Sequence, residues 1–323
     1  MSNPTRPIHG SMTFPPPSSK QEGSVGVEDP RDKPKLTHQD VTALNFIGNR
    51  GGFVFRRHYR AGLRSHIMEV LDPAEVRKEK EGVVLDGVRC FPRARPLKML
   101  RIFRTRFMDL KEVEEELKTV QIVNAYLAPA YVARSEEFVV DLEWHGRREL
   151  VLCGLQEYVE GEVLDPWRTL EDGHLFMLFE RMAVPQPDAS ESIAREWVQG
   201  VREKAGDLVQ RLRKMILEAN TIPDLAGAGN LILAPTGHIK LVDINNISRV
   251  SLDSTIRIDD RGYPVCDKSV EALSVLEQKL ARRSTVPEDL IYRTFLDPQR
   301  LKEVKALEQQ FHGGSGGALD YVE

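Results

Sequence analysis

Three polar side chains between residues 224 and 243 have the types and spacing that suit a hard cation. Asp224, Asn230 and Asp243 surround two short apolar runs separated by a Pro-Thr-Gly turn, a pattern that predicts a β-hairpin. Because a hairpin fixes the separation of its two ends, we expect Asn230 and Asp243 to converge on one metal ion. Mg²⁺ prefers oxygen ligands and is usually bound by a few protein groups together with substrate phosphates. Asp224 is expected to lie where a carboxylate can meet a nucleophile.

The same stretch resembles the catalytic and metal-binding loops of the protein-kinase-like superfamily, which includes protein kinases and small-molecule kinases of the aminoglycoside and choline type. Their pattern is an Asp, a short spacer, an Asn and a hairpin that ends in a metal-binding Asp. Asn230 and Asp243 are 13 residues apart (243 − 230), as in the family. Asp224 and Asn230 are 6 apart (230 − 224), one residue more than the usual interval. The alternative interpretation is a surface hairpin with ordinary turn residues.

The composition excludes several classes of protein. A net charge of −4 argues against nonspecific nucleic-acid binding, so no nucleic acid is expected as a partner. The three cysteines are widely separated and form no CxxC pair, which favours a reducing compartment. No apolar run is long enough to predict a membrane span, and the first residues lack the apolar core of a secretory signal. These features predict a cytoplasmic protein.

The chain divides into four regions by composition. Residues 1–36 are rich in Pro, Ser, Gly and charge and are predicted to form a flexible N-terminal leader. Residues 37–160 are strand-rich and are predicted to form a nucleotide-binding N-lobe. Residues 161–311 are predicted to form a C-lobe that carries the catalytic and metal-binding loops. Residues 312–323 begin with a Gly-rich stretch and are predicted to be a flexible tail.

Apolar periodicity predicts the elements of the two lobes. Short strands are expected at residues 46–48, 53–55, 82–85, 88–91, 97–103, 138–142 and 150–153. One helix interrupts them, with Asp109 as its N-cap and Glu112 as the capping-box partner. Further helices are expected at about 190–220, 267–280 and 297–311. This order predicts an α+β protein with a two-lobe protein-kinase-like fold, a strand-rich N-lobe and a mainly helical C-lobe.

The resemblance implies residues that contact ATP at both ends. Gly48, Gly51 and Gly52 are expected to cover the phosphates, because glycines let backbone N–H groups approach phosphate closely. Glycines at this density also make ordinary hairpin turns, and that alternative stays open. Glu157 and Val159, which follow a buried-looking strand, resemble the family's hinge, whose backbone hydrogen-bonds adenine.

In the family, a lysine on the third strand pairs with the phosphates and is anchored by a glutamate on the following helix. Lys98 has the family's residue type, whereas Arg101 fits the apolar context better, and the two remain alternatives. An arginine at this position would not be a neutral exchange, because its planar fork differs from an ammonium group. Glu116, or its neighbour Glu114, is expected to pair with the cation. The alternative is a solvated charged face on this helix.

Two aspartates are assigned roles through the resemblance. Asp224 corresponds to the catalytic-loop aspartate that orients the acceptor hydroxyl, although Pro223 and Ala226 depart from the family pattern. Its alternative role is to cap a turn in a Gly-rich loop. Asp267 resembles the aspartate that opens the central C-lobe helix and contacts the catalytic loop, with an ordinary N-cap as the alternative. Only 24 residues (267 − 243) lie between Asp243 and Asp267, which favours an atypical bacterial or small-molecule kinase over a regulated protein kinase.

The resulting hypothesis is an ATP- and Mg²⁺-dependent phosphotransferase that acts on an unknown small-molecule or protein acceptor. The alternative is a pseudokinase that serves as a nucleotide-binding, scaffold or interaction module. A third possibility is an α+β protein unrelated to kinases. A structure in which Asn230 and Asp243 face one cleft would exclude this last possibility.

Overall fold

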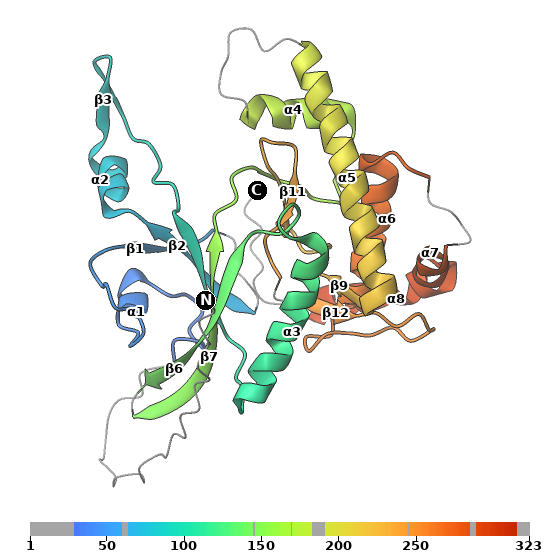
Figure 1. Cartoon of the computed structure of the whole chain (residues 1–323), viewed down its shortest axis with the longest axis horizontal. Coiled ribbons are helices and arrows are strands. Elements are labelled where there is room, and N and C mark those ends of the chain that lie inside the picture. The colour runs from blue at the N-terminus through green and yellow to red at the C-terminus, as the bar shows by residue number, and fades with distance from the viewer. Residues whose placement is uncertain are drawn as a thin grey trace, which may run out of the picture.

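An antiparallel sheet and a group of helices make up the molecule, which is therefore an α+β protein (Figure 1). This computed structural model describes residues 29–59, 64–144, 146–168, 170–182, 191–244, 246–284 and 289–314. In the view of Figure 1 the sheet lies on the left and most helices lie on the right. One helix, α3 (Leu110–Leu127), lies between the sheet and the helices on the right of this view.

The sheet has five strands in the spatial order β1-β2-β5-β7-β6, and every neighbouring pair is antiparallel. Their bounds are β1 (Val54–Arg57), β2 (Ser65–Leu71), β5 (Lys98–Phe103), β6 (Ser135–Trp144) and β7 (Arg147–Glu157). Side chains alternate between the two faces of a sheet. One face carries Phe55, Met68 and Leu100 and packs on Val41 of α1 (His38–Thr42) in a continuous apolar core. We call the opposite face, which carries Arg101, the inner face.

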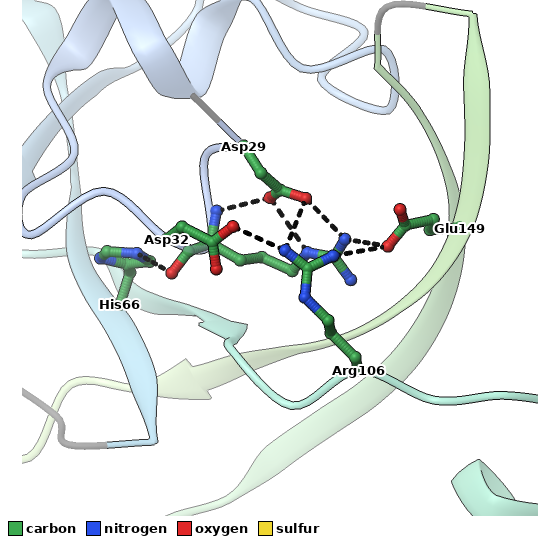
Figure 2. A network of polar contacts seen from close by, with 6 residues as sticks. Asp29, Asp32, His66, Arg106 and Glu149 are labelled. Atoms are coloured by element: carbon green, nitrogen blue, oxygen red, sulfur yellow. Dashed lines mark hydrogen bonds and ion pairs between the residues drawn. The ribbon is translucent and has the colours of Figure 1, made fainter. Parts of the chain in front are cut away.

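The segment before α1 is anchored to the sheet by the charged network drawn in Figure 2. Arg31 is buried and donates to Asp29, with 2.7 Å between Nη2 and Oδ2, and to Glu149 of β7. Arg106 bridges the same two carboxylates and also pairs with Asp32 at 2.6 Å. The described part of the predicted leader, residues 29–36, is therefore packed against the sheet. Residues 1–28 lie outside the described residues.

An insertion separates β2 from β5 in the chain. It consists of helix α2 (Pro73–Glu81) and a hairpin of β3 (Val83–Leu85) with β4 (Val88–Cys90). Asp72 caps α2 by accepting a hydrogen bond from the Ala74 N–H at 2.7 Å. Apolar side chains on the hairpin, including Val84 and Val88, are exposed. Neither α2 nor β2 was predicted from the sequence, which placed only one helix among the strands.

The helical part is built on α5 (Glu191–Ala219), which carries the predicted apolar stripe. Val201, Leu208 and Leu212 on this stripe are fully buried against the other helices. The remaining elements are α4 (Asp172–Met182), α6 (Val265–Val275) with its π-helical continuation η1 (Leu276–Leu280), α7 (Leu290–Phe295) and α8 (Pro298–Gly314). The helices predicted at about 190–220, 267–280 and 297–311 are therefore confirmed.

Two further small antiparallel sheets complete the fold. Strand β10 (Leu231–Leu233) pairs with β11 (Ile239–Leu241) on one side and with β8 (Glu162–Val163) on the other. Strand β9 (Thr221–Pro223) pairs with β12 (Ile247–Arg249). The pairing of β9 with β12 brings Asp224, which follows β9, next to Asn246, which precedes β12.

Most of the predicted strands are also confirmed, and residues 46–48 are the exception because they form turns and coil. Asp109 caps α3 as predicted by accepting from the Glu112 N–H at 3.0 Å, but the Glu112 side chain turns to the Met108 N–H instead. Cys153 and Cys266 are buried and Cys90 is partly exposed. Among the described residues no helix combines the length and apolar character needed to cross a membrane.

Candidate functional site

The predicted hairpin between residues 230 and 243 is present. Leu231 lies opposite Leu241 in the register of β10 and β11, so the residues that flank this pair meet at one end of the hairpin. The Val242 N–H donates to the Asn230 carbonyl oxygen at 2.9 Å. This bond continues the ladder and brings the backbones next to Asn230 and Asp243 together, as the sequence pattern requires.

The loop that carries Asp224 is organised around its own carboxylate. Oδ1 of Asp224 accepts from the N–H groups of Ala226 and Gly227 at 3.0 and 2.9 Å. Nδ2 of Asn230 donates to the Asp224 carbonyl oxygen at 2.9 Å. A Cβ atom at position 227 would lie 2.4 Å from Nδ2 of Asn230, so only glycine allows this approach. The loop therefore accommodates its extra residue and still joins Asp224 to Asn230.

Asn246, which immediately precedes β12, holds Asp224 in place through two contacts. The Asp224 N–H donates to the Asn246 carbonyl oxygen at 2.9 Å, and Nδ2 of Asn246 lies 3.4 Å from Oδ2 of Asp224. The sequence identified Asn245 and Asn246 only as polar residues after Asp243, and Asn245 lies outside the described residues. The pairing of β9 with β12 produces the contact, because it aligns the ends of two segments far apart in the chain.

The two aspartates form a centre of negative charge. Burial raises the pKa of the Asp224 carboxyl, and the Asp243 carboxylate raises it further, although hydrogen bonds from Gly227 and Ala226 oppose the shift. Two carboxylates held close together in a low-dielectric region favour a bound cation or a bound proton. The raised pKa of Asp224 therefore reflects the charge of Asp243 as well as burial.

Arg101 is the positive group next to this centre. Its side chain is only 1% exposed, and Asp243 and Glu137 are the charges that stabilise its ionised form against the cost of burial, which lowers the pKa of the guanidinium. Nη2 donates to Oε1 of Glu137 at 2.8 Å and to Oγ of Ser135 at 3.0 Å. Lys98, the alternative cation, is exposed at the first position of β5. The structure therefore brings Arg101, and not Lys98, to Asp243.

Gly154 makes the position of Arg101 possible. It lies directly opposite Arg101 on β7, and Glu137 lies opposite Gly154 on β6. A Cβ atom at position 154 would be 3.0 Å from Nη2 of Arg101. The guanidinium crosses the strand over this glycine to reach Glu137. Sequence reasoning missed both residues, because the strands predicted at 138–142 and 150–153 are shorter than β6 and β7 and include neither Glu137 nor Gly154.

The charges that stabilise the Arg101 guanidinium are Asp243 and Glu137, and not the expected carboxylates of α3. Glu116 is half-buried on α3, and burial raises the pKa of its carboxyl while Arg64 lowers it. Glu114 is exposed. Arg64 itself, just before β2, donates to Oδ1 of Asp260 at 2.5 Å in the loop before α6. The partner expected on α3 is replaced by Glu137 on β6, and α3 instead contributes a carboxylate near Arg64.

Gly48, Gly51 and Gly52 lie in the loop between α1 and β1. This loop enters β1 at Val54, which is opposite Leu71, at the same end of the sheet as Lys98 and Glu157. A Cβ atom at Gly48 or Gly51 would meet nothing within 4 Å. The structure does not bring these glycines to Asp243. The connection between β1 and β2 lies at the Arg101 end, but its residues 60–63 lie outside the described residues.

Glu157 ends β7 and begins the connecting segment, residues 157–161, that leads into the helical part. Its N–H donates to the Arg134 carbonyl oxygen at 2.8 Å, and its Oε1 accepts from the Arg134 N–H at 3.0 Å. Val159 is half-buried in this segment. The preceding residue, Gln156, donates from Nε2 to the Val242 carbonyl oxygen at 3.0 Å. The sheet is thus tied to the residue before Asp243.

Asp267 does not have its expected contact. It lies in the first turn of α6, where Pro264 is the N-cap residue, and forms a buried ion pair with Arg300 at 2.5 Å. The contact to the Asp224 loop comes from Ser269, whose Oγ accepts from the Leu225 N–H at 3.2 Å. The helix still supports the loop, through a residue two positions further along.

The donor set fits Mg²⁺ better than a soft metal. Nδ2 of Asn230 is turned to the Asp224 backbone, so the amide oxygen is the end of this side chain that can act as a ligand, together with the Asp243 carboxylate. Within the described ranges no group of three or more His, Cys, Asp or Glu is arranged to hold a metal ion. Two oxygen ligands without a closed cage are typical of Mg²⁺ bound jointly with phosphate.

Comparison with known proteins adds no relative to this picture. No family model matches the chain, and no curated protein matches it either.

Proposed function

We propose that this protein is an ATP- and Mg²⁺-dependent phosphotransferase with a protein-kinase-like fold, acting on an acceptor hydroxyl that is not yet identified. The observation that carries the proposal is the electrostatic interaction of Arg101 on the sheet with Asp243 at the end of the hairpin, where Gln156 ties β7 to Val242 by a hydrogen bond of 3.0 Å. Asn230 and Asp224 join the same group through their hydrogen bond. Phosphoryl transfer needs this combination of a cation, two metal ligands and a carboxylate.

The order of elements supports the proposal. Three strands of the sheet are followed by a single long helix, α3, and then by the last two strands, which lead through the connecting segment into the helices. The candidate cation lies on the third of these strands, and both candidate metal ligands lie after the long helix α5. This is the arrangement that the resemblance in the sequence implies for a two-lobe kinase-like protein.

Each residue has a role that follows from its environment. Asn230 and Asp243 would hold Mg²⁺, which supplies neutralisation of phosphate charge when it is bound. Arg101 would orient the phosphates beside Asp243. Asp224 would accept the proton of the acceptor hydroxyl as the new phosphorus–oxygen bond forms and the bond to the leaving ADP breaks. Its raised pKa makes it a stronger base than an exposed aspartate.

A pseudokinase is the second candidate, and the hydrogen bonds of Asp224 favour it. One oxygen of the carboxylate already accepts from two backbone N–H groups, and the other lies near the Asn246 amide. Arg101 is likewise held by Glu137 and Ser135. A site whose polar groups satisfy one another can serve as a rigid binding module without turnover.

Binding and turnover measurements separate the two candidates. Calorimetry with Mg²⁺-ATP tests binding, and an ATP-hydrolysis assay with a panel of hydroxyl acceptors tests turnover. We expect both in the native protein, loss of binding in Asp243→Asn, and loss of turnover with retained binding in Asp224→Asn. Asp141→Asn, at an exposed position of β6, is the matched control. Binding without turnover that is unaffected by Asp224→Asn would establish the pseudokinase instead.

A further inference from the structure

We propose that the site around Arg101 and Asp243 recognises its donor through the phosphate groups and the metal, with little selectivity for the base. This inference rests on the proposed function and concerns the chemical class of the donor. It comes from the inner face of the sheet, where the position that a base would take is occupied by charged side chains of the protein itself.

A row of five residues crosses the whole sheet on the inner face. Arg56, Glu69, Met99, Gln156 and Ser135 are directly opposite one another, each on a different strand. Because Met99 is two residues before Arg101 on the same strand, the row points to the same side of the sheet as Arg101. The row therefore lies on the same face of the sheet as Arg101, which is the face where the proposed function places the donor.

The register locates this row relative to the phosphate end. It lies two residues closer to the connecting segment than Arg101 does, or about 7 Å at a rise of roughly 3.4 Å per residue. A nucleotide whose phosphates lie at Arg101 and Asp243, and whose base points to the connecting segment, would place the base at or beyond this row. The side chains of this row therefore determine whether a base can bind at this position.

Glu69 occupies the centre of this position. It is only 2% exposed although it lies on the inner face. Oε2 accepts from Nε of Arg56 at 2.7 Å, Oε1 lies 2.9 Å from Nδ1 of His58, and Nη2 of Arg93 lies 3.4 Å from Oε1. The groups that bury this carboxylate belong to the chain itself. A flat apolar base would have to displace them.

Contacts with the insertion between β2 and β5 hold the Arg56 side chain beside Glu69. Nη1 of Arg56 donates to both oxygens of Glu79 on α2 at 2.8 and 2.9 Å, and Nη2 donates to the Ala94 carbonyl oxygen at 3.0 Å. Arg95 forms an ion pair with Glu160 of the connecting segment. The segment after β4 thus reaches the place where a base would meet the connecting segment.

The energetic balance between the two ends of the proposed site therefore favours phosphate. Opening the buried charge network around Glu69 is costly because an uncharged base returns no charge to the groups that lose their partners. Arg101 is also buried and paired with Glu137, but Mg²⁺ and phosphate bring charges of their own, which compensate Asp243 and Arg101 in place of the contacts they displace. The ligand class that fits is a Mg²⁺-bound triphosphate, whether it carries adenine, guanine or no nucleoside.

Calorimetric titration of the full chain with four probes tests the inference. We expect Mg²⁺-ATP, Mg²⁺-GTP and Mg²⁺-tripolyphosphate to bind with affinities that agree within about threefold, and adenosine to give no heat. ATP binding that is about tenfold or more tighter than tripolyphosphate binding, or any binding of adenosine, would overturn the inference and leave the proposed function intact. Failure of all three triphosphates to bind would overturn both.

Two variants assign the result to this site. Asp243→Asn should weaken all three triphosphates by the same factor, and unchanged affinities would place the ligands elsewhere and contradict the inference. The double variant Arg56→Leu, Glu69→Leu makes the row apolar and should raise the preference for ATP over tripolyphosphate by about tenfold. An unchanged ratio in a double variant that unfolds cooperatively would also contradict it. The titrations of the native chain decide the question if that variant does not fold.

Discussion

Gly154 lies opposite Arg101, and a Cβ atom at position 154 would be 3.0 Å from Nη2 of the guanidinium. We expect Gly154→Ala to shift Arg101 away from Glu137 and to lower the free energy of unfolding by about 1–3 kcal/mol, the usual cost of overpacking. Gly154→Val should cost more. Urea denaturation measures the change, and Gly173→Ala, at a position with nothing within 4 Å, is the control. Equal stabilities of the 154 and 173 variants would show that Arg101 has room to move.

Arg101 compensates two buried or partly buried acids. Its replacement in Arg101→Met keeps the length of the side chain but leaves Glu137 and Asp243 without their cation. Removing one partner of a buried pair costs about 3–5 kcal/mol, so we expect a loss of this size in urea denaturation. The double variant Arg101→Met, Glu137→Gln should recover part of it, because one of the unpaired charges is gone. Additive effects of the two changes would contradict a direct pair.

The buried Asp224 carboxylate should lower the free energy of unfolding of the unliganded protein at neutral pH. Since its folded pKa is raised, the folded state holds a proton that the unfolded state has lost, and stability falls as pH rises above the unfolded pKa of about 3.9. Asp224→Asn removes this penalty and keeps an acceptor for the Ala226 and Gly227 N–H groups. We expect it to be more stable than the native protein by about 1 kcal/mol at neutral pH, with the difference closing below pH 4. A less stable variant at neutral pH would contradict the assignment.

His66 should make the sheet sensitive to acid. It is buried, and burial together with Arg104 lowers its pKa from the ordinary 6.5 to about 4. As pH falls, the unfolded state therefore binds a proton at a higher pH than the folded state does. The contribution of neutral His66 to the free energy of unfolding is fully present above pH 6.5 and is lost, by as much as about 3 kcal/mol, as pH falls to about 4. His66→Gln should flatten this decline in urea denaturation. His312→Gln, on an exposed position of α8, should leave it unchanged.

The parts of the fold that could be predicted are those determined by local pattern. The Asp109 cap, the apolar stripe of α5 and the turn of the 231–241 hairpin are each specified by residues close together in the chain. The positions of Asn230 and Asp243, the candidate site residues at the ends of that hairpin, follow from its geometry. They could be located without knowledge of any other element.

The parts that could not be predicted depend on pairings between distant segments. Strand β2 was missed because Glu69 and His66 are buried polar residues that interrupt its apolar pattern, and their partners come from other elements. The choice of Glu137 as the partner of Arg101 follows from the register of three strands. The family resemblance suggested the carboxylates of α3, which lie closer to Arg101 in the chain.

The most direct test of the account is a calorimetric titration of the native protein and of Asp243→Asn with Mg²⁺-ATP under identical conditions. The Asp243 carboxylate interacts electrostatically with both Arg101 and Asp224. Removal of its charge should therefore weaken the binding of the metal and of the phosphates together. We predict saturable binding to the native protein and a loss of at least about tenfold in affinity in the variant. The absence of binding to the native protein, or equal affinity in Asp243→Asn, would contradict the central claim that Asn230, Asp243 and Arg101 form a Mg²⁺-phosphate site.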